Sequence, residues 1–350
     1  MRRSENICKF GVTGQASGSE TLTVYILKRL CAMRTKHYFL IFTLLTMLNC
    51  CKDDESDNDN KNISRNDKGI SLNISLSGSI QNPAFSSDGN SIVFTRFRNG
   101  YNAEPADIFI YNIQTNQLST LVSDGSCNVN LPGSTWNDSI NSIVFSSSRN
   151  SHDEIYLIPE SGTIGSEIKI TNRTDQVAYE PSLSPDGQWI VFESHKLDVE
   201  DNGIITKYKI DGTSPYIQLT LSSDDCRQPN WSPRGDKILY QKFEGGLWDI
   251  WTMSTDGTDR FKVTSGVGNK TDASFSSDGQ YIIFSANIES DLANIYKIPV
   301  TGGTPFRLTN YNGYDGAPSI SSDGTKIVFE SCSGDPDDSK GTSLIILNLN

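Results

Sequence analysis

One short phrase recurs six times along this 350-residue chain, and the recurrence constrains the fold more than any other feature of the sequence. A well-formed copy is Pro-Ser-Leu-Ser-Pro-Asp-Gly at 181–187, followed by the apolar triplet Ile-Val-Phe at 190–192. The copy at 229–235 has Arg-Gly in place of Asp-Gly, and the degenerate copy at 134–140 lacks that dipeptide. Successive turn positions are 50, 48, 48, 44 and 45 residues apart, at Asp88, Asp138, Asp186, Arg234, Asp278 and Asp323. A period of this size is typical of a propeller or a solenoid.

Each repeat predicts a four-stranded antiparallel unit. The apolar residue before the turn ends one strand, and the triplet after the turn forms the core of the next. Three apolar residues in succession indicate a strand that is buried on both faces, as in a sheet between two neighbouring sheets. Ser-Pro-Asp-Gly favours a tight turn, because proline presets one dihedral angle and glycine accepts the left-handed position. Six such units without helical periodicity predict an all-β fold, a six-bladed β-propeller.

The outer half of each unit follows from the next apolar stretches. Third strands are predicted at Asp107–Ile113, Glu154–Ile158, Ile204–Ile210, Asp249–Met253, Asn294–Ile298 and Ser343–Leu347. Fourth strands are predicted to contain Leu219-Thr220, Val263-Thr264 or Leu308-Thr309. The last unit has no fourth strand of its own before Asn350, so we expect the apolar stretch 70–76 to complete it and close the ring. Closure removes the open edge of an unfinished sheet; the alternative is that 70–76 is a linker.

The repeated phrase resembles the PD40 repeat of the TolB-like propellers, a WD40-like family, and the resemblance covers about residues 70–350. It implies a six-bladed propeller. It says little about function, because that family includes transport accessories, enzymes and domains attached to peptidases.

The front of the chain resembles an export signal. A basic stub at 34–37 is followed by 11 mostly apolar residues, too few for the roughly 20 that span a bilayer. The stretch ends in a lipobox-like sequence, with Leu48 at −3 and Cys50 at −1 relative to Cys51. Cys51 is therefore the predicted lipidation site; Cys50 fits less well because Asn49 would then occupy −1. The alternative is that both are plain thiols.

The residues after Cys51 suggest where the lipoprotein is sent. Lys-Asp-Asp-Glu at 52–55 resembles the Bacteroidetes-type signal for display on the outer cell surface, and the alternative is an acidic tether that only solvates. The predicted organisation is a mis-called extension at 1–32, a signal peptide at 33–50, an acidic flexible tether at 51–69 and the propeller at 70–350. Translation is then expected to start at Met33.

Composition limits the partners. Residues 1–51 hold seven of the 30 Lys and Arg and two of the 42 Asp and Glu, which leaves a net charge near −17 for the rest. Such a surface repels nucleic acid and anionic lipid, so no nucleic acid partner is expected. Cys127, Cys226 and Cys332 are an odd number, and free, partly buried thiols are expected over a disulfide. Without a Cys-x-x-Cys motif or a histidine cluster, no metal or other cofactor is predicted. We expect a monomer.

The loops at one end of the blades carry the candidate binding residues. Those entering the inner strands place polar pairs around the predicted channel mouth: Gln81-Asn82, Gly133-Ser134, Tyr179-Glu180, Arg227-Gln228, Thr271-Asp272 and Asp315-Gly316. The loops between second and third strands add Phe97, Tyr101, His195, Phe243 and Trp248 as stacking surfaces. A few polar groups among aromatics is the usual composition of a ligand pocket. The alternative is that these polar groups only bind water and one another.

Enzymatic interpretations have weaker support. The sequence has no Gly-x-Ser-x-Gly elbow, and only His152 and His195 follow the signal, too few for the multi-histidine metal centre of the oligogalacturonate lyases that resemble this family. Glu180, Asp272 and Asp315 remain as an acid–base pair or a divalent-cation site. The acidic run 335–338 is expected to be a solvated loop rather than a calcium site.

Two further features bear on function. Asp138-Ser139-Ile140 resembles the Bacteroidetes O-glycosylation acceptor, which makes Ser139 a candidate site on an exposed turn. Three functions compete. The favoured one is a non-catalytic binding platform for a protein, peptide or glycan, anchored by lipid to the outer membrane and exposed at the cell surface, or facing the periplasm. The others are a TolB-like periplasmic accessory of envelope integrity or transport, and a glycan-active hydrolase or lyase.

Overall fold

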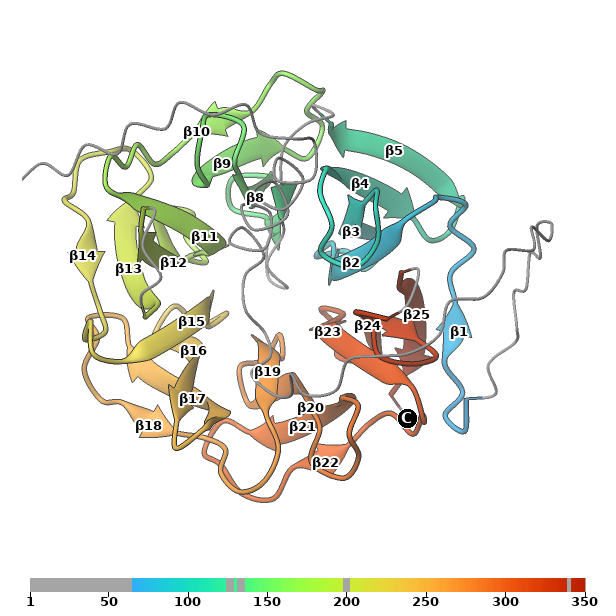
Figure 1. The fold of residues 1–350 in the computed structure, drawn as a ribbon. Coiled ribbons are helices and arrows are strands. Elements are labelled where there is room, and N and C mark those ends of the chain that lie inside the picture. Colours follow the sequence, from blue (N-terminus) through green and yellow to red (C-terminus); the bar gives the residue numbers. More distant parts are fainter. Residues whose placement is uncertain (1–64, 124–128, 131–135, 198–201, 339–340, 350) are drawn as a thin grey trace, which may run out of the picture. The chain divides into compact units, whose positions relative to one another are not determined.

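Six antiparallel sheets follow one another around a central opening in the computed structural model (Figure 1). The structure describes residues 65–123, 129–130, 136–197, 202–338 and 341–349, within the compact unit Lys61–Asn350. First strands of neighbouring sheets contact each other, β2 with β23, β11 with β15, and β19 with both β15 and β23. The predicted six-bladed propeller is confirmed, and the described residues contain no helix, so none that could cross a membrane.

Four blades have their strands in sequence order. Blade 1 contains β2 (Ser79–Phe85), β3 (Ser91–Phe97), β4 (Ala106–Asn112) and β5 (Gln117–Val122). Blade 3 contains β11 (Gln176–Leu183), β12 (Trp189–Lys196), β13 (Ile204–Lys209) and β14 (Ile217–Gln218). Blade 4 contains β15 (Asp225–Trp231), β16 (Lys237–Glu244), β17 (Leu247–Ser254) and β18 (Phe261–Lys262). Blade 5 contains β19 (Lys270–Phe275), β20 (Tyr281–Ala286), β21 (Asn294–Pro299) and β22 (Phe306–Arg307).

The other two blades depart from this order. In blade 2 the first strand is split into β6 (Val129–Asn130) and β7 (Trp136–Asn137), which both pair with β8 (Ser142–Ser147), followed by β9 (Glu154–Pro159) and β10 (Ile168–Lys169). Blade 6 contains β23 (Tyr314–Ile320), β24 (Lys326–Cys332) and β25 (Ser343–Asn348), and its fourth strand is β1 (Ile70–Ser71). The six predicted third strands are confirmed as β4, β9, β13, β17, β21 and β25.

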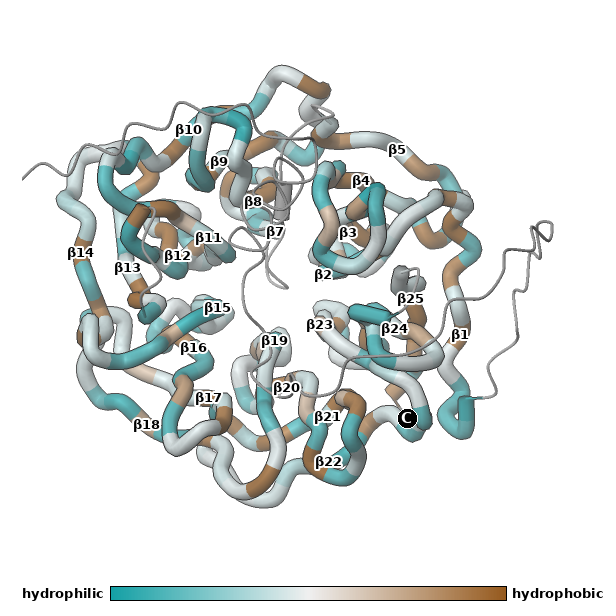
Figure 2. The backbone as a smooth tube through the Cα atoms, viewed as in Figure 1, coloured by the Kyte–Doolittle hydropathy of each residue, from teal (hydrophilic) through white to brown (hydrophobic). Residues whose placement is uncertain are grey.

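The apolar triplets form the core, as their uninterrupted pattern predicts. Ile92, Val93 and Phe94 are completely buried, and so are the corresponding triplets of blades 2, 3, 5 and 6. Figure 2 shows hydrophobic positions within every sheet and hydrophilic ones in many of the connecting loops. Since each fully buried aliphatic or aromatic side chain contributes about 1.5–3 kcal/mol, the triplets are a principal source of stability.

The repeated serine and aspartate stabilise the turn between the first two strands. In blade 1 the Ser86 hydroxyl donates to Oδ1 of Asp88 over 2.6 Å, and Gly89 adopts a left-handed φ of 70°. Blades 3, 5 and 6 repeat this bond at 2.5–2.6 Å. In blade 4 the Ser232 hydroxyl donates instead to Asp236, two residues after Arg234. The blade 4 turn therefore still has a carboxylate that accepts the serine hydroxyl, although its motif has Arg-Gly in place of Asp-Gly.

The fourth strands end earlier than predicted. The sequence placed Leu219-Thr220 in the strand, but β14 ends at Gln218, and blades 4 and 5 show the same offset. The reason is that a threonine hydroxyl replaces a backbone acceptor: the N–H groups of Ile205, Ile250 and Ile295 donate to Oγ1 of Thr220, Thr264 and Thr309 over 2.8–3.0 Å.

The N-terminal segment closes the ring, over fewer residues than the expected 70–76. Strand β1 pairs Ile70 with Ile346 and Ser71 with Ile345. One further backbone bond joins Leu72 N to Leu344 O, and then the ladder ends. The side chains of Leu72, Ile74 and Leu76 still pack against the hydrophobic core of blades 1 and 6. The interpretation of this segment as a linker is therefore wrong.

An arginine cluster attaches this segment to blade 6. Both terminal nitrogens of Arg65 donate to the Asp315 carboxylate, over 2.9 and 2.7 Å, and Nη1 also donates to the Ser331 hydroxyl. Arg65 also pairs with Asp67, and its guanidinium lies 4.5 Å from the centroid of the Tyr311 ring. Asp315 is completely buried. Two-point contacts of this kind are the strongest class of protein ion pair.

Candidate functional site in the central channel

The first strands line the channel, and five of them contain the same β-bulge. The register between first and second strands shifts after Gln81, Tyr179, Arg227, Thr271 and Gly316. The next residue in each has a left-handed backbone, with φ between 45° and 51°: Asn82, Glu180, Gln228, Asp272 and Ala317. In four blades proline follows, and because proline has no N–H it is tolerated at a bulge. Left-handed non-glycine residues cost about 1–3 kcal/mol each and cluster at functional sites.

The bulge turns a backbone N–H towards the preceding blade. Asn82 N donates to Oε2 of Glu330 over 3.1 Å, and Gln228 N donates to Oε2 of Glu193 over 3.2 Å. Ala317 N donates in the same way to the Ser285 hydroxyl over 3.0 Å. The acceptor in each case is the residue directly after an apolar triplet.

That position is polar in all six blades: Thr95, Ser146, Glu193, Gln241, Ser285 and Glu330. The sequence analysis missed this ring of residues. The sequence did contain a signal for this ring. The residue after the triplet lies on the same face of the strand as the middle residue of the triplet, so a polar side chain there continues an otherwise apolar, buried face. Polar residues that continue a buried strand need partners, and here several of them find partners across the channel wall.

Glu330 is the centre of the first half of the site. Its Oε1 accepts hydrogen bonds from the hydroxyls of Tyr101 and Tyr314 over 3.1 and 3.0 Å, while Oε2 accepts the Asn82 N–H. Glu330 is 2% exposed. Burial, together with the nearby charge of Asp272, raises the pKa of Glu330 from 4.5 to about 7. Among the described residues no basic side chain forms an ion pair with either carboxylate.

Glu193 is the centre of the second half. Its Oε1 lies 2.5 Å from Nε2 of His195, and Oε2 accepts the Gln228 N–H. The ring of Tyr179 meets His195 edge to face at 6.0 Å. Burial lowers the pKa of Arg227, but its hydrogen bond to Asp225 and the charges of Glu193 and Glu180 outweigh this, so the net shift is upward.

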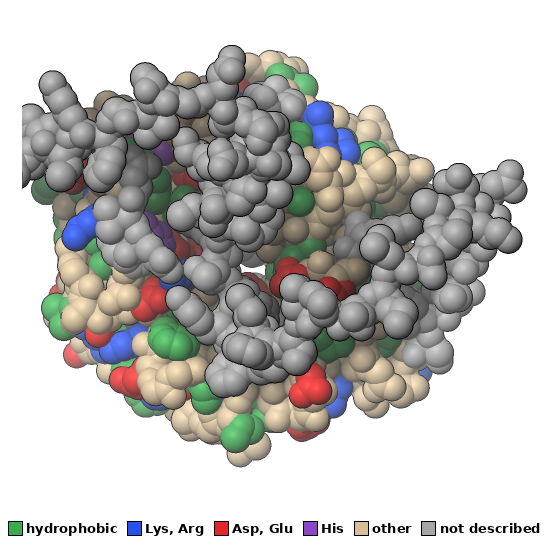
Figure 3. Space-filling view, viewed as in Figure 1, with side chains coloured by type: hydrophobic (Ala, Val, Ile, Leu, Met, Phe, Trp, Pro, Cys, Tyr) green, Lys and Arg blue, Asp and Glu red, His purple; other side chains and the backbone are tan. Residues whose placement is uncertain are grey.

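Gln228 connects the two halves. Its amide nitrogen donates to Asp272 over 3.0 Å and to Glu180 over 3.3 Å, and its amide oxygen accepts the Asp272 backbone N–H. Four predicted residues, Asn82, Glu180, Gln228 and Asp272, are thus brought together at the channel wall and are half-buried. Acidic side chains border the central opening on the face shown in Figure 3. The site is rich in carboxylates held by neutral donors.

The structure corrects the expected location of these residues. They lie inside the first strands, not before them, because each strand begins a few residues earlier and continues through the bulge. Two predicted residues do not face the channel. Gln81 is 1% exposed and donates to the Ser79 hydroxyl, and Asp315 is bound by Arg65. The sequence alignment matched Gly316 with Asn82, but the bulge residue equivalent to Asn82 is Ala317. Asp315 was therefore aligned one position early, and a shift of one residue moves a side chain to the other face of the strand.

Aromatic residues lie at one end of blade 4. The rings of Phe243 and Trp248 are 5.3 Å apart, and the Arg227 guanidinium lies 5.2 Å from the Trp248 ring. Phe243 is 44% exposed. Arg227 also forms a two-point ion pair with Asp225, so it bridges this aromatic pair and the channel wall. Phe97 is instead buried in the core.

Two side-chain atoms of the polar ring have no hydrogen-bond partner among the residues that the structure describes. Ser146 Oγ and Gln241 Oε1 are both unpartnered, in residues that are 1% and 7% exposed. They occupy the position from which Glu193 and Glu330 reach the channel in blades 3 and 6. Buried polar atoms are nearly always satisfied, so these two indicate bound water or a ligand.

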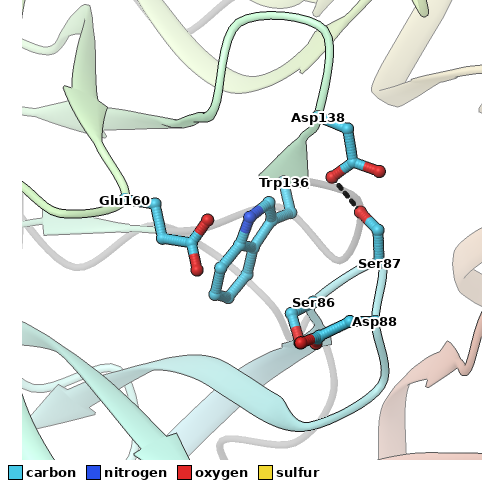
Figure 4. Close-up of a pocket in the computed structure, with 6 residues that line it drawn as sticks. All are labelled: Ser86, Ser87, Asp88, Trp136, Asp138 and Glu160. Carbon is cyan, nitrogen blue, oxygen red and sulfur yellow. Dashed lines mark hydrogen bonds between the residues drawn. The ribbon is translucent and has the colours of Figure 1, made fainter.

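An open pocket of about 400 Å³ lies at the opposite ends of the strands, on the side of the turns between first and second strands. Its lining residues are Ser86, Ser87, Asp88, Trp136, Asp138 and Glu160. Figure 4 shows the Trp136 ring between Glu160 and the Ser86–Asp88 turn. This pocket contains none of the residues of the channel network. Nearby, Ser139 is exposed as expected, and its hydroxyl donates to the Pro185 carbonyl.

The remaining predictions have mixed outcomes. Cys226 and Cys332 are buried, burial raises the pKa of Cys226 to about 12, and the Cys332 thiol donates to the Gly334 carbonyl over 3.2 Å. No group of three His, Cys, Asp or Glu in the described part of the chain is arranged to hold a metal ion. Cys51, Cys127, Gly133, Ser134 and the signal and tether before residue 65 lie outside the described residues.

These features define a class: a closed six-bladed β-propeller whose channel is lined by acidic and neutral polar side chains from its first and second strands. The family model of the TolB beta propeller domain, PD40, matches residues 64–262 and 221–340, so the chain belongs to this family. The resemblance noted in the repeated phrase is confirmed.

Individual proteins agree with this assignment. The Tol-Pal system protein TolB of Francisella tularensis subsp. holarctica is 31% identical over 189 residues, which are 53% of this chain and 41% of that protein. The crystal structure of TolB from Acinetobacter baumannii matches with a TM-score of 0.59 and 20% identity, over 76% of this chain and 65% of that one. A puromycin hydrolase shares the fold, with a TM-score of 0.52, 14% identity and coverage of 77% and 47%. The aligned part of this chain spans less than half the length of the Francisella TolB protein.

Proposed function

We propose that this protein is a non-catalytic binding platform of the cell envelope, which holds a protein, peptide or glycan at the mouth of its channel. The observation that carries the proposal is the network from Glu330 through Asp272 and Gln228 to Glu193. Together with Asn82 and Glu180, which bind this network, its members come from five blades, and four of them are left-handed residues held against local strain. Strain of this kind persists only where the surrounding structure maintains it, and it is a feature of sites that hold polar groups in place for a ligand.

The rim supports a binding role over catalysis. The exposed ring of Phe243 and the half-buried ring of Trp248 form an aromatic surface beside the charged Arg227. Aromatic and arginine side chains together are typical of the residues that contribute most to binding a partner. In the enzymatic alternative, a glycan-active hydrolase or lyase, two of the channel carboxylates would act as acid and base, and turnover of a glycan substrate would establish it.

The cellular location rests on the sequence before residue 65. We propose that Cys51 carries the lipid, that the lipid anchors the protein to the outer membrane, and that the propeller faces the outside of the cell. Metabolic labelling with a fatty acid tests the anchor, and the label should disappear in Cys51→Ser but persist in Cys50→Ser. Protease treatment of intact cells then distinguishes surface display from a periplasm-facing propeller.

A TolB-like envelope accessory is the second candidate, and the comparisons favour it. The family match and the TolB relatives suggest a protein partner within the envelope. Cross-linking in intact cells followed by mass spectrometry should then recover an envelope protein. In the platform proposal a surface ligand, such as a glycan, is recovered instead.

Two substitutions test the binding site itself, one at the channel rim and one in the channel wall. Trp248→Ala and Glu180→Ala should each weaken capture of the partner or of glycans on an array by about tenfold, because each removes a contact of more than about 1 kcal/mol. Glu160→Ala, in the pocket on the opposite side, is the matched control and should bind normally. Undiminished binding by both Trp248→Ala and Glu180→Ala would exclude the channel mouth as the site.

A further inference from the structure

We propose that the channel, between Glu330, Asp272 and Gln241, binds a primary ammonium group, such as the side chain of a lysine in the partner. The inference rests on the proposed function, since it names the chemistry that the same site recognises. It is carried by three observations on the described residues: two carboxylates without a basic partner, unsatisfied oxygen atoms in the polar ring that contains Glu330, and acceptors contributed by several blades.

The first observation is the pair of carboxylates. Glu330 in β24 and Asp272 in β19 receive hydrogen bonds from neutral groups, namely two tyrosine hydroxyls, a threonine hydroxyl, the Gln228 amide and a backbone N–H. Neutral donors orient a carboxylate but leave its charge uncompensated. The repulsion between the two carboxylates, added to burial, raises the pKa of Glu330. A cation between them relieves both effects.

The second observation does not depend on these charges. Gln241 Oε1 in blade 4 and Ser146 Oγ in blade 2 are buried and have no partner within the described part of the chain, at the ring position that Glu330 occupies in blade 6. Gln241 pairs across the sheet with Arg227, the residue before Gln228, so it lies beside the residue that binds Asp272. An N–H group of a ligand would donate the hydrogen bond that Gln241 Oε1 does not receive from the described residues.

The third observation selects the kind of cation. An ammonium group is a compact charge with three N–H donors that point in different directions, whereas a guanidinium needs coplanar acceptors. The acceptors here come from the strands β24, β19 and β16 of three blades, in contrast to the contact between Arg65 and the single carboxylate of Asp315.

The test uses the purified full-length protein and the peptide acetyl-Gly-Gly-Lys-Gly-Gly-amide at pH 8, with binding followed by calorimetry or ligand-observed NMR. The matched probe replaces lysine with norleucine, which keeps the aliphatic chain and removes the charge. We expect the lysine peptide to bind about tenfold or more tightly than the norleucine peptide, since hydrogen bonds between charged groups are worth about 1.5–3 kcal/mol.

Substitutions locate the site. Glu330→Gln and Asp272→Asn should each reduce lysine-peptide affinity by about tenfold, while Glu160→Gln, in the pocket on the opposite side, should leave it unchanged. Melting temperatures show that each variant is folded, and Asp272→Asn serves if Glu330→Gln does not fold. Equal binding of the two peptides, or full affinity in both channel variants, overturns the inference. So does binding of calcium ions alone that these variants abolish while the peptide does not bind.

The inference and the proposed function fail in different ways. If Trp248→Ala abolishes partner capture while Glu330→Gln and Asp272→Asn leave it intact, the platform stands and the ammonium site is wrong. If the lysine peptide binds and requires Glu330, but no partner is captured at the rim, the ammonium site stands and the platform is wrong.

Discussion

The backbone N–H of Asn82 donates a hydrogen bond to Oε2 of Glu330 over 3.1 Å, across the boundary between the first and last blades. The equivalent bond between Gln228 and Glu193 joins blades 4 and 3. Arg65 and strand β1 attach to blade 6 the N-terminal segment that leads into blade 1. The channel network and ring closure are therefore parts of one structural arrangement, and each can be tested separately.

Arg65→Met should lower the free energy of unfolding by about 3 kcal/mol, because it leaves the Asp315 carboxylate buried without its guanidinium. Urea denaturation followed by tryptophan fluorescence measures the change. Adding Asp315→Leu should recover part of the loss, since no charge is then buried.

The control for that variant is Arg307→Met. Arg307 pairs with Glu289 over 2.9 Å, but Glu289 is 57% exposed, so the pair is worth no more than about 1 kcal/mol. Similar losses in Arg65→Met and Arg307→Met would mean that the Arg65 cluster does not hold the ring.

Glu330→Gln should change how stability depends on pH. The pKa of Glu330 is about 7 in the folded protein and 4.5 as its ordinary value, because of burial and the Asp272 charge, with Tyr101, Tyr314 and the Asn82 N–H as the other neighbours. The unfolded chain therefore releases this proton first as the pH rises. The stability from this group is complete below pH 4.5 and is lost up to about pH 7, a difference of about 3 kcal/mol.

Unfolding curves at pH 4, 5, 6, 7 and 8 test this prediction. Between pH 4.5 and about 7, the free energy of unfolding of the wild-type protein should fall relative to that of Glu330→Gln. Above pH 7, plots of this free energy against pH should run parallel for the two proteins. If the two plots of unfolding free energy against pH are parallel from pH 4 upward, the pKa of Glu330 is not raised in the folded protein.

Thr264→Val should destabilise blade 4 by about 1–3 kcal/mol, because the buried N–H of Ile250 loses the Thr264 hydroxyl at 2.8 Å as its acceptor. Thr264→Ser keeps the hydroxyl and is the matched control. Amide hydrogen exchange gives a local measurement: the Ile250 amide should exchange faster in the valine variant and normally in the serine variant. Unchanged protection in the valine variant would contradict this role of the threonine.

Asp236→Ala should lower stability by about 1 kcal/mol, because the Ser232 hydroxyl loses its acceptor in the blade 4 turn. Arg234→Ala should have a smaller effect, since its guanidinium lies at the surface and donates only to the Asp278 carbonyl. Thermal unfolding of the two variants distinguishes them. A larger loss in Arg234→Ala would show that the arginine, not Asp236, replaces the turn aspartate.

The channel shows how far the repeat predicts a site. Aligning the motif was enough to place Asn82, Glu180, Gln228 and Asp272 at equivalent positions of the channel wall, because they precede the motif at a constant distance. The same reasoning failed for Asp315, which is one position out of step. It also missed Glu193 and Glu330, since a polar residue that follows an apolar triplet can equally well be the exposed end of a strand.

The sequence by itself determined the number of blades, the position of the tight turns and the identity of the buried triplets, because these depend on local dihedral preferences and on the spacing of apolar residues. Only the tertiary structure decided which polar residues meet. The bulge that rotates Asn82 and Gln228 towards the preceding blade requires a neighbouring sheet to accept the displaced N–H. The contact between Arg65 and Asp315 joins residues separated by almost the whole propeller, and no local pattern records it.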